Sequence, residues 1–160
     1  MLHPYYIKQF LPNPFLNWDI IEQIIKTSNS EFVEVIDENG NKHKYNDTDK
    51  RNSIIISDCW NKHPAFEHIL RFLYIRDNLN FKKWDVHIYA SLTGGRSFPM
   101  HIDPSANYII QFKGKCKWII QDKFDIILEK GDLIYIPPKW PHECKPLGER
   151  ISISIPQWLK

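Results

Sequence analysis

The sequence places a histidine and an aspartate two residues apart, at His101 and Asp103. Because residues i and i+2 of a β-strand point to the same side, these side chains can present an imidazole and a carboxylate to one space. Both groups are good ligands for a divalent metal ion. Such a pair also arises by chance, and the alternative is a polar pair at an exposed strand edge. A metal site therefore requires a third ligand from another part of the chain.

His142 is the best candidate for that third ligand. It follows the apolar run from Leu133 to Ile136 and the stiff connection Pro137-Pro138-Lys139-Trp140-Pro141. Two histidines and one carboxylate on neighbouring strands match the facial triad that binds non-haem Fe(II) and leaves coordination positions open. The pattern therefore predicts an Fe(II) site formed by His101, Asp103 and His142. The alternative for His142 is a histidine in a surface loop.

Hydrophobic periodicity predicts the elements that must position these residues. Two helices are expected in the N-terminal half, one from Trp18 to about Thr27 with Asn17 as its N-cap, and one from Pro64 to near Arg76. The chain up to Pro14 is expected to be an extended segment packed on the domain.

The rest of the pattern is typical of short β-strands. A hairpin is expected from Glu31 to Tyr45, with its turn at Asp37-Glu38-Asn39-Gly40. Further strand-like runs are Ser53–Ser57, Trp84–Ser91, Asn107–Phe112, Lys117–Gln121, Ile126–Leu128, Leu133–Ile136 and Ile151–Ile155. Short strands spaced roughly 8–12 residues apart indicate a sandwich or barrel. The sequence therefore predicts a mainly β protein, a barrel with two helices contributed by its N-terminal half.

Composition and charge narrow the class of protein. A chain of 160 residues is one domain by the usual expectation. The formal net charge of +2 gives no strong argument for an acidic membrane surface as partner and weighs against a nucleic-acid duplex. No apolar run approaches the ~20 residues needed to cross a bilayer. The three cysteines lack a C-x-x-C spacing, and the N-terminus lacks a signal pattern. We therefore expect a cytoplasmic protein with no membrane partner, and its oligomeric state is left open.

Several motifs of the C-terminal half occur in the order of a known enzyme family. They are His101 and Asp103, then Gln111, Gly114, Trp118, Gly131-Asp132, Pro137-Pro138 and His142. Over about residues 84–158, this order resembles the JmjC/cupin-like branch of the 2-oxoglutarate- and Fe(II)-dependent oxygenases. The resemblance implies a double-stranded β-helix, the jelly-roll or cupin barrel, with the metal near one mouth. It implies one domain over 1–160, in which residues 1–83 pack on a metal-binding barrel at 84–158.

The resemblance also implies 2-oxoglutarate as cosubstrate and O2 as co-reactant. 2-Oxoglutarate would chelate the iron through its 2-oxo acid end, and its far carboxylate then needs a buried cation. JmjC-like members often carry a lysine at the position that holds Cys116 here. The neighbours Lys115 and Lys117 have the opposite strand parity, unless a bulge near Gly114 shifts the register.

Arg150 offers an alternative cation. Arg150 and Ser152 form an Arg-x-Ser element that resembles one on the last core strand of other 2-oxoglutarate oxygenases. A guanidinium binds a carboxylate with two charge-assisted hydrogen bonds. We predict Arg150 as the anchor, Ser152 as its helper and Lys117 as the fallback, while the alternative for Arg150 is a surface arginine in a turn. Two further candidates for the cosubstrate site are Asn107 and Tyr89.

The implied activity is hydroxylation of a C–H bond with release of succinate and CO2. The carboxylate of Asp103 favours hydroxylation over halogenation, because halogenases of the family vacate that position. The substrate is expected to be a small molecule or a protein side chain, and a nucleobase stays open. Residues 31–45 and 91–97 are the expected rim of the site. Two alternatives are a catalytically inactive cupin-fold module that binds a metal or ligand, motivated by the missing lysine, and a cupin metalloenzyme without 2-oxoglutarate.

Overall fold

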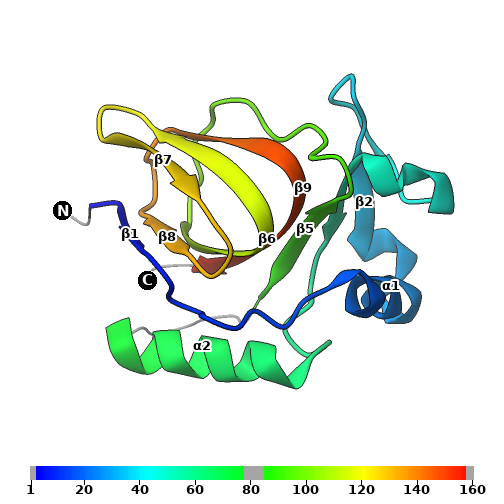
Figure 1. Ribbon diagram of the computed structural model, residues 1–160, viewed down its shortest axis with the longest axis horizontal. Coiled ribbons are helices and arrows are strands. Elements are labelled where there is room, and N and C mark those ends of the chain that lie inside the picture. The colour runs from blue at the N-terminus through cyan, green and yellow to red at the C-terminus, as the bar shows by residue number, and fades with distance from the viewer. Residues whose placement is uncertain (1–2, 78–84, 158–160) are drawn as a thin grey trace.

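Figure 1 shows the protein as a computed structural model, which describes residues 3–77 and 85–157. Strands curve around a barrel, α2 runs beneath it, and α1 lies beside the strands of the N-terminal half. In chain order the elements are β1 (Tyr5–Ile7), α1 (Trp18–Thr27), the 3-10 helix η1 (Ser30–Phe32), β2 (Val33–Ile36), β3 (Lys42–Lys44), the 3-10 helix η2 (Asp47–Arg51), β4 (Ser53–Ile56), α2 (Pro64–Asp77), β5 (His87–Ser91), β6 (Ala106–Ile120), β7 (Phe124–Leu128), β8 (Leu133–Ile136) and β9 (His142–Gln157).

The strands form one antiparallel sheet around the pairing of β6 with β9. The order of neighbours is β1-β8-β6-β9-β5-β4-β2-β3, and β7 pairs with β6. Strands β6 and β9 pair from Ala106 opposite Gln157 to Ile120 opposite His142, so nearly their whole lengths are joined. Because β4 pairs with β5, the N-terminal strands extend the same sheet. The prediction of a mainly β, cupin-type jelly roll with two α-helices is confirmed.

Both α-helices begin and pack as the sequence predicts. The side chain of Asn17 accepts a hydrogen bond from the Ile20 backbone N–H at 3.0 Å and caps α1. The apolar side of α1 buries Ile21 and Ile24. Four residues at helical spacing bury the corresponding side of α2, namely Phe66, Ile69, Leu70 and Leu73. These side chains join the main hydrophobic core with the inward-facing isoleucines of β4, β5 and β9.

The two longest strands are longer than the sequence pattern indicated. The predicted strands over 107–112 and 117–121 are parts of the single strand β6. Register shifts occur between Gln111 and Lys113 and between Gly114 and Cys116. These bulges keep β6 paired with β9 through the Lys113-Gly114 segment, where the sequence resembles a turn. The predicted strand over 151–155 is likewise the end of β9, which already begins at His142. Trp84, the predicted start of β5, lies outside the described residues.

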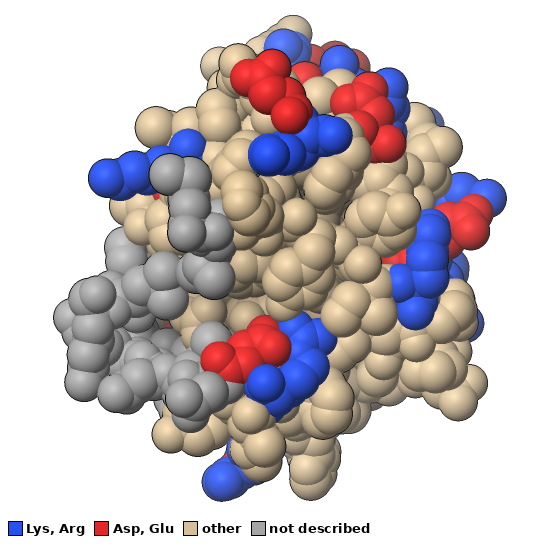
Figure 2. All heavy atoms as spheres, turned by 90° about the vertical axis from the view of Figure 1, so that its left-hand side faces the viewer, with Lys and Arg blue, Asp and Glu red and all other residues tan. Residues whose placement is uncertain are grey.

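The surface combines both charge signs. On the face in Figure 2, lysine and arginine side chains lie close to aspartate and glutamate side chains, and no broad patch has a single sign. Exposed ion pairs such as Lys115 with Glu129 bring the two signs together on the surface. Among the described residues, no helix has the length and hydrophobicity of a membrane-spanning segment.

Gly114 marks the closest approach of β6 to β9. Its backbone has φ +71°, and a Cβ atom added there would lie 1.6 Å from the carbonyl oxygen of Glu149. Only a residue without a side chain fits this position, because the colliding atom belongs to the backbone of the paired strand.

We expect Gly114→Ala to destabilise the protein by more than about 3 kcal/mol, because the added methyl group must push β9 away from β6. The free energy of unfolding in urea measures this loss. Gly148→Ala is the matched control, since Gly148 has φ +133° but no heavy atom within 4 Å of an added Cβ. The control loses only about 1–2 kcal/mol for its backbone conformation. Equal losses in the two variants would contradict the collision as the cause.

Candidate metal centre and cosubstrate pocket

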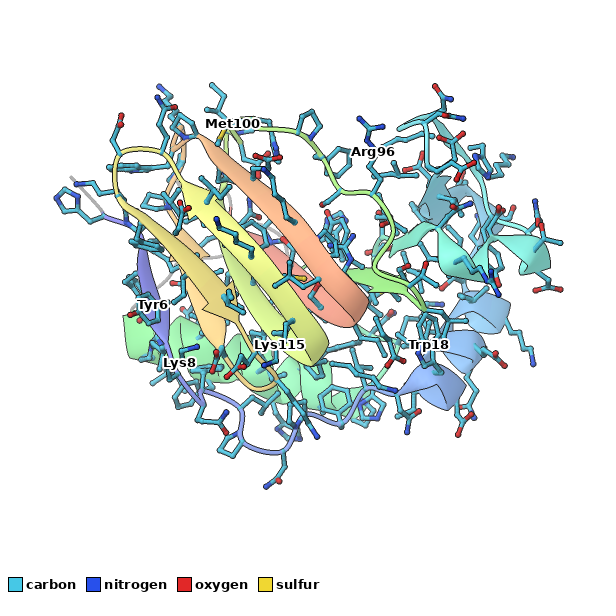
Figure 3. All side chains as sticks on the ribbon, turned by 45° about the horizontal axis from the view of Figure 1, so that its top comes forward. Tyr6, Lys8, Trp18, Arg96, Met100 and Lys115 are labelled. Atoms are coloured by element: carbon cyan, nitrogen blue, oxygen red, sulfur yellow. The ribbon has the colours of Figure 1, made fainter. Side chains whose placement is uncertain are left out.

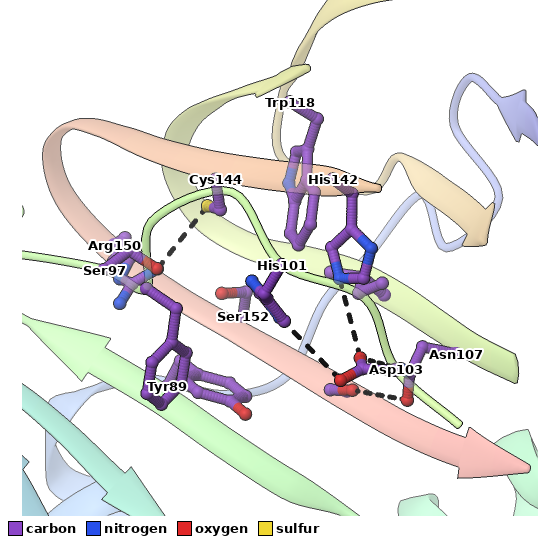
Figure 4. Close-up of a pocket in the computed structure, with 13 residues that line it drawn as sticks. Tyr89, Ser97, His101, Asp103, Asn107, Trp118, His142, Cys144, Arg150 and Ser152 are labelled. Carbon is purple, nitrogen blue, oxygen red and sulfur yellow. Dashed lines mark hydrogen bonds and ion pairs between the residues drawn. The ribbon is translucent and has the colours of Figure 1, made fainter. Parts of the chain in front are cut away.

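The structure brings His101, Asp103 and His142 together at one end of the barrel (Figure 4). The backbones of His101 and His142 form an isolated antiparallel bridge, with N–H to carbonyl distances of 3.0 and 2.9 Å. Asp103 Oδ1 lies 3.8 Å from His101 Nε2, and Asp103 Oδ2 lies 3.5 Å from His142 Nε2. One ligand atom from each residue lies within 4.8 Å of the others. The three side chains therefore surround a space that one metal ion can fill.

Backbone carbonyl groups set the tautomer of both histidines. His101 Nδ1 lies 2.8 Å from the carbonyl oxygen of Pro99, and His142 Nδ1 lies 2.8 Å from that of Trp140. A carbonyl oxygen only accepts hydrogen bonds, so both Nδ1 atoms carry a proton. In the neutral rings each Nε2 then has a free lone pair on the side of Asp103. This arrangement is typical of metal-binding histidines, whose second nitrogen donates to a fixed acceptor.

Asp103 is held as a carboxylate. The adjacent imidazole of His142 lowers the pKa of Asp103 below its ordinary value, against the opposing effect of burial. Asn107 adds a hydrogen bond from its Nδ2 to Asp103 Oδ2 at 2.6 Å. Two imidazole nitrogens and an ionised, oriented carboxylate form a donor set that suits Fe(II).

These three residues open onto a pocket inside the barrel. Its lining is Tyr89, Ser97, Phe98, His101, Asp103, Asn107, Ile109, Trp118, His142, Cys144, Arg150, Ser152 and Ser154. In Figure 4, Arg150 lies at the opposite end of the pocket from Asp103 and Asn107. Of the residues predicted for the site from the sequence, only Lys117 is missing from this lining.

Arg150 is a buried cation without an acidic partner among the described residues. Its relative exposure is 2%. Nη2 donates to Ser53 Oγ at 3.1 Å, Nη1 donates to Cys144 Sγ at 3.7 Å, and the buried Nε atom has no partner. The guanidinium also lies 5.8 Å from the centre of the Tyr89 ring. Burying an unpaired charge is costly, so this arrangement suits an anionic ligand such as the far carboxylate of 2-oxoglutarate.

The other candidates for the cosubstrate site divide into two groups. Tyr89 and Ser152 are register partners on β5 and β9 and both line the pocket. Burial raises the pKa of Tyr89 to about 12, so its hydroxyl is a neutral hydrogen-bonding group. Lys117 instead forms an ion pair with Asp125 on β7 at 3.0 Å. It is held away from the pocket, because its strand parity directs it to the opposite face of the sheet from Trp118.

Lys115 also lies outside the pocket. Its Nζ lies 2.5 Å from Glu129 Oε1, and Figure 3 shows it near the lower ends of the strands, far from Met100 at the top, the residue next to His101. Cys116, which holds the position of the expected lysine, is a buried residue of β6 and pairs with Pro146 of β9. The bulge near Gly114 therefore does not turn either neighbouring lysine into the pocket.

Two residues near this pocket were not predicted as site residues from the sequence. Trp118, which the sequence offered only as a motif residue, packs against His142 with a distance of 6.1 Å between ring centres, and its buried indole N–H has no partner among the described residues. Ser53 touches Arg150 from a strand 97 residues earlier in the chain. No local pattern could signal that contact, because Ser53 precedes three isoleucines and reads only as the start of a buried strand.

Comparison with known proteins agrees with this geometry. The cupin domain family matches residues 88–153. The ribosomal protein uL16 3-hydroxylase of Escherichia coli (strain K12) is 32% identical over an alignment of 92 positions, which covers 44% of this chain and 24% of that protein. This part of the chain is thus similar to a cupin domain, and the predicted resemblance to the JmjC/cupin-like oxygenases is confirmed.

Solved structures show the same fold over nearly the whole chain. The ribosomal oxygenase YcfD from Escherichia coli, in complex with cobalt and 2-oxoglutarate, superposes with a TM-score of 0.73 at 21% identity over 99% of this chain. Its complex with cobalt and succinic acid gives a TM-score of 0.72 at 22% identity over 98%. In both cases the chain covers 48% of the other protein. It therefore spans about half the length of these structural relatives, and about a quarter of the curated one.

We expect His142→Ala to weaken Co(II) binding by about 100-fold or more, because one of three ligand atoms is lost. Calorimetric titration of the metal-free protein with Co(II) measures this. His87→Ala is the matched control, since His87 lies on β5 with its ring between Ser57 and Asp85, outside the cluster. The control should bind Co(II) like the unchanged protein. Unchanged affinity in His142→Ala would exclude the cluster as the metal site.

Proposed function

We propose that this protein is an Fe(II)- and 2-oxoglutarate-dependent oxygenase that hydroxylates a C–H bond and releases succinate and CO2. One observation carries the proposal: the His-Asp-His cluster and a buried arginine without an acidic partner line the same pocket. The first group suits a metal ion and the second suits a carboxylate. A 2-oxo dicarboxylic acid has the groups to bind both at once.

Each side chain of the pocket has a role in this proposal. His101, Asp103 and His142 would hold Fe(II), and Arg150 with Ser152 would hold the far carboxylate of 2-oxoglutarate. Bound Fe(II) and 2-oxoglutarate would together supply the oxidative decarboxylation and the transfer of one atom of O2 to the substrate. Asn107 orients Asp103 through its 2.6 Å hydrogen bond.

The walls of the pocket separate this chemistry from bulk water. Phe98, Ile109 and Trp118 contribute apolar surface around the cluster. Tyr89 covers the guanidinium of Arg150 and adds no charge, because its hydroxyl stays protonated at neutral pH. Apolar walls strengthen the attraction between Arg150 and an anion, and they protect a reactive oxidant from side reactions.

The substrate class follows from the relatives. A protein side chain is the proposed substrate, since the curated relative is named as a hydroxylase of a ribosomal protein. A small molecule is the alternative. The proposal also includes a cytoplasmic location, no membrane or duplex nucleic-acid partner, and one domain in which residues 1–83 support the barrel at 84–158. The pairing of β4 with β5 across that boundary supports this single unit.

We expect the Ni(II)-loaded protein to bind 2-oxoglutarate, and Arg150→Ala to weaken that binding by about 100-fold, because two charge-assisted hydrogen bonds are lost. Calorimetric titration measures both affinities. Lys117→Ala is the control for the fallback anchor and should leave the affinity unchanged, since Lys117 pairs with Asp125. A loss of affinity in Lys117→Ala alone would identify Lys117, and not Arg150, as the residue that binds the far carboxylate.

We also expect turnover with Fe(II) and O2 to release succinate, and Asp103→Ala to abolish that release. Proton NMR of the reaction mixture detects succinate directly. Tight binding of 2-oxoglutarate without any succinate, over a panel of peptides and small molecules, would favour the inactive cupin-fold module. Unchanged succinate release from Asp103→Ala would exclude the metal site.

A further inference from the structure

The segment between β5 and His101 forms one wall of the pocket. Within this loop, defined as residues 92–100, Ser97 and Phe98 line the pocket. The Phe98 ring lies 5.7 Å from the His101 ring in an edge-to-face arrangement, and Lys42 Nζ lies 5.3 Å from the centre of the Phe98 ring. Figure 3 shows the loop along the rim, with Arg96 and Met100 labelled. This loop therefore forms part of the pocket wall beside the candidate metal ligands.

The start of the loop is fastened to the segment that leads into β4. Ser91 Oγ and Thr93 Oγ1 both donate to the carbonyl oxygen of Arg51 at 2.8 Å. Ser53 Oγ donates to the carbonyl oxygen of Arg96. Gly95 has φ +61°, and a Cβ atom there would lie 2.7 Å from Ser53 Oγ. The loop is thus pressed directly onto Ser53.

The same hydroxyl group also contacts the proposed anchor. Ser53 is fully buried, and its Oγ accepts a hydrogen bond from Arg150 Nη2 at 3.1 Å while it donates to the loop. A hydroxyl has one proton to donate, and that of Ser53 points to the carbonyl oxygen of Arg96. A lone pair of Oγ then accepts the hydrogen bond from Arg150 Nη2. A chain of hydrogen bonds therefore runs from the guanidinium through Ser53 to the loop backbone, and each bond polarises the next.

We propose that Ser53 is a positioning residue that couples the anchor Arg150 to the loop over the pocket. It holds Nη2 in place, so that the unpartnered Nε–H of Arg150 is presented to a carboxylate. It also holds the loop closed beside the ligand. This inference rests on the proposed function, because the carboxylate is that of 2-oxoglutarate. Coupling of this kind is reciprocal, so bound 2-oxoglutarate stabilises the closed loop as much as the closed loop stabilises the ligand.

Ser53→Ala removes the shared hydroxyl, and Ser91→Ala is the matched control. Both serines are fully buried and both anchor the loop region, and Ser91 lies opposite Arg150 in the β5–β9 ladder, but the Ser53 hydroxyl is the one that hydrogen-bonds with the guanidinium. Two readouts are needed on the Ni(II)-loaded proteins. Calorimetry gives the affinity for 2-oxoglutarate. Limited trypsin digestion with mass spectrometry gives the cleavage rate after Arg96, with and without saturating 2-oxoglutarate.

We expect 2-oxoglutarate to slow cleavage after Arg96 in the unchanged protein. Ser53→Ala should bind 2-oxoglutarate about tenfold more weakly, the value for one lost hydrogen bond to a charged group. At saturation it should also lose most of the protection of Arg96. Ser91→Ala should be cleaved faster but keep both its affinity and its ligand-dependent protection. Ser53→Cys, which keeps the size of the side chain, should fall between the unchanged protein and Ser53→Ala.

Three results would overturn the proposal. The first is unchanged affinity in both Ser53 variants. The second is an equal loss of affinity in Ser91→Ala, which would reduce Ser53 to general support of the loop. The third is protection by 2-oxoglutarate that persists in Ser53→Ala. Failure of the proposed function has a different signature, because then the unchanged protein itself would not bind 2-oxoglutarate.

Discussion

The long antiparallel ladder between β6 and β9 is the interaction on which the rest of the structure depends. It carries Asn107 and Trp118 on one strand, and His142, Arg150 and Ser152 on the other. Because the two strands remain paired through two bulges, both ends of the pocket belong to one hydrogen-bonded unit. The close contact at Gly114, opposite Arg150, allows the strands to approach where the anchor enters the barrel. A rigid ladder is a suitable support for the two groups that we propose to bind the same small molecule.

The electrostatic arrangement of the pocket follows from where that ladder places its charges. The carboxylate of Asp103 lies between two imidazoles at one end, and the guanidinium of Arg150 lies at the other. Arg150 is buried among a hydroxyl, a thiol and an aromatic ring, with no acid of the described chain to neutralise it. Such a site is less stable than an apolar core of the same size, and a bound anion offsets the difference. The stability that the protein gains when an anion pairs with Arg150 therefore contributes to its affinity for that anion.

The N-terminal half contributes to the site as well as covering the barrel. Strand β4 pairs with β5 and places Ser53 against Arg150, while β3 places Lys42 against Phe98. At the other edge of the sheet, β1 pairs with β8, and Asp132 accepts hydrogen bonds from the Lys8 ammonium and the Gln9 backbone N–H. Elements that are distant in sequence thus hold the pocket wall and the anchor in place from outside the cupin core.

The sequence by itself determined the local elements and the chemistry of the site. Periodicity and capping placed α1 and α2, because a helix is specified by the spacing and ends of its own residues. The residue types and order of His101, Asp103 and His142 predicted a metal site, and the alternation at Arg150 and Ser152 predicted a shared face. Only the tertiary structure decided that β6 and β9 are continuous, that Lys117 pairs with Asp125, and that Ser53 hydrogen-bonds with both Arg150 and the loop backbone. These features depend on bulges and on contacts between distant segments, whose free energies arise only when the barrel closes.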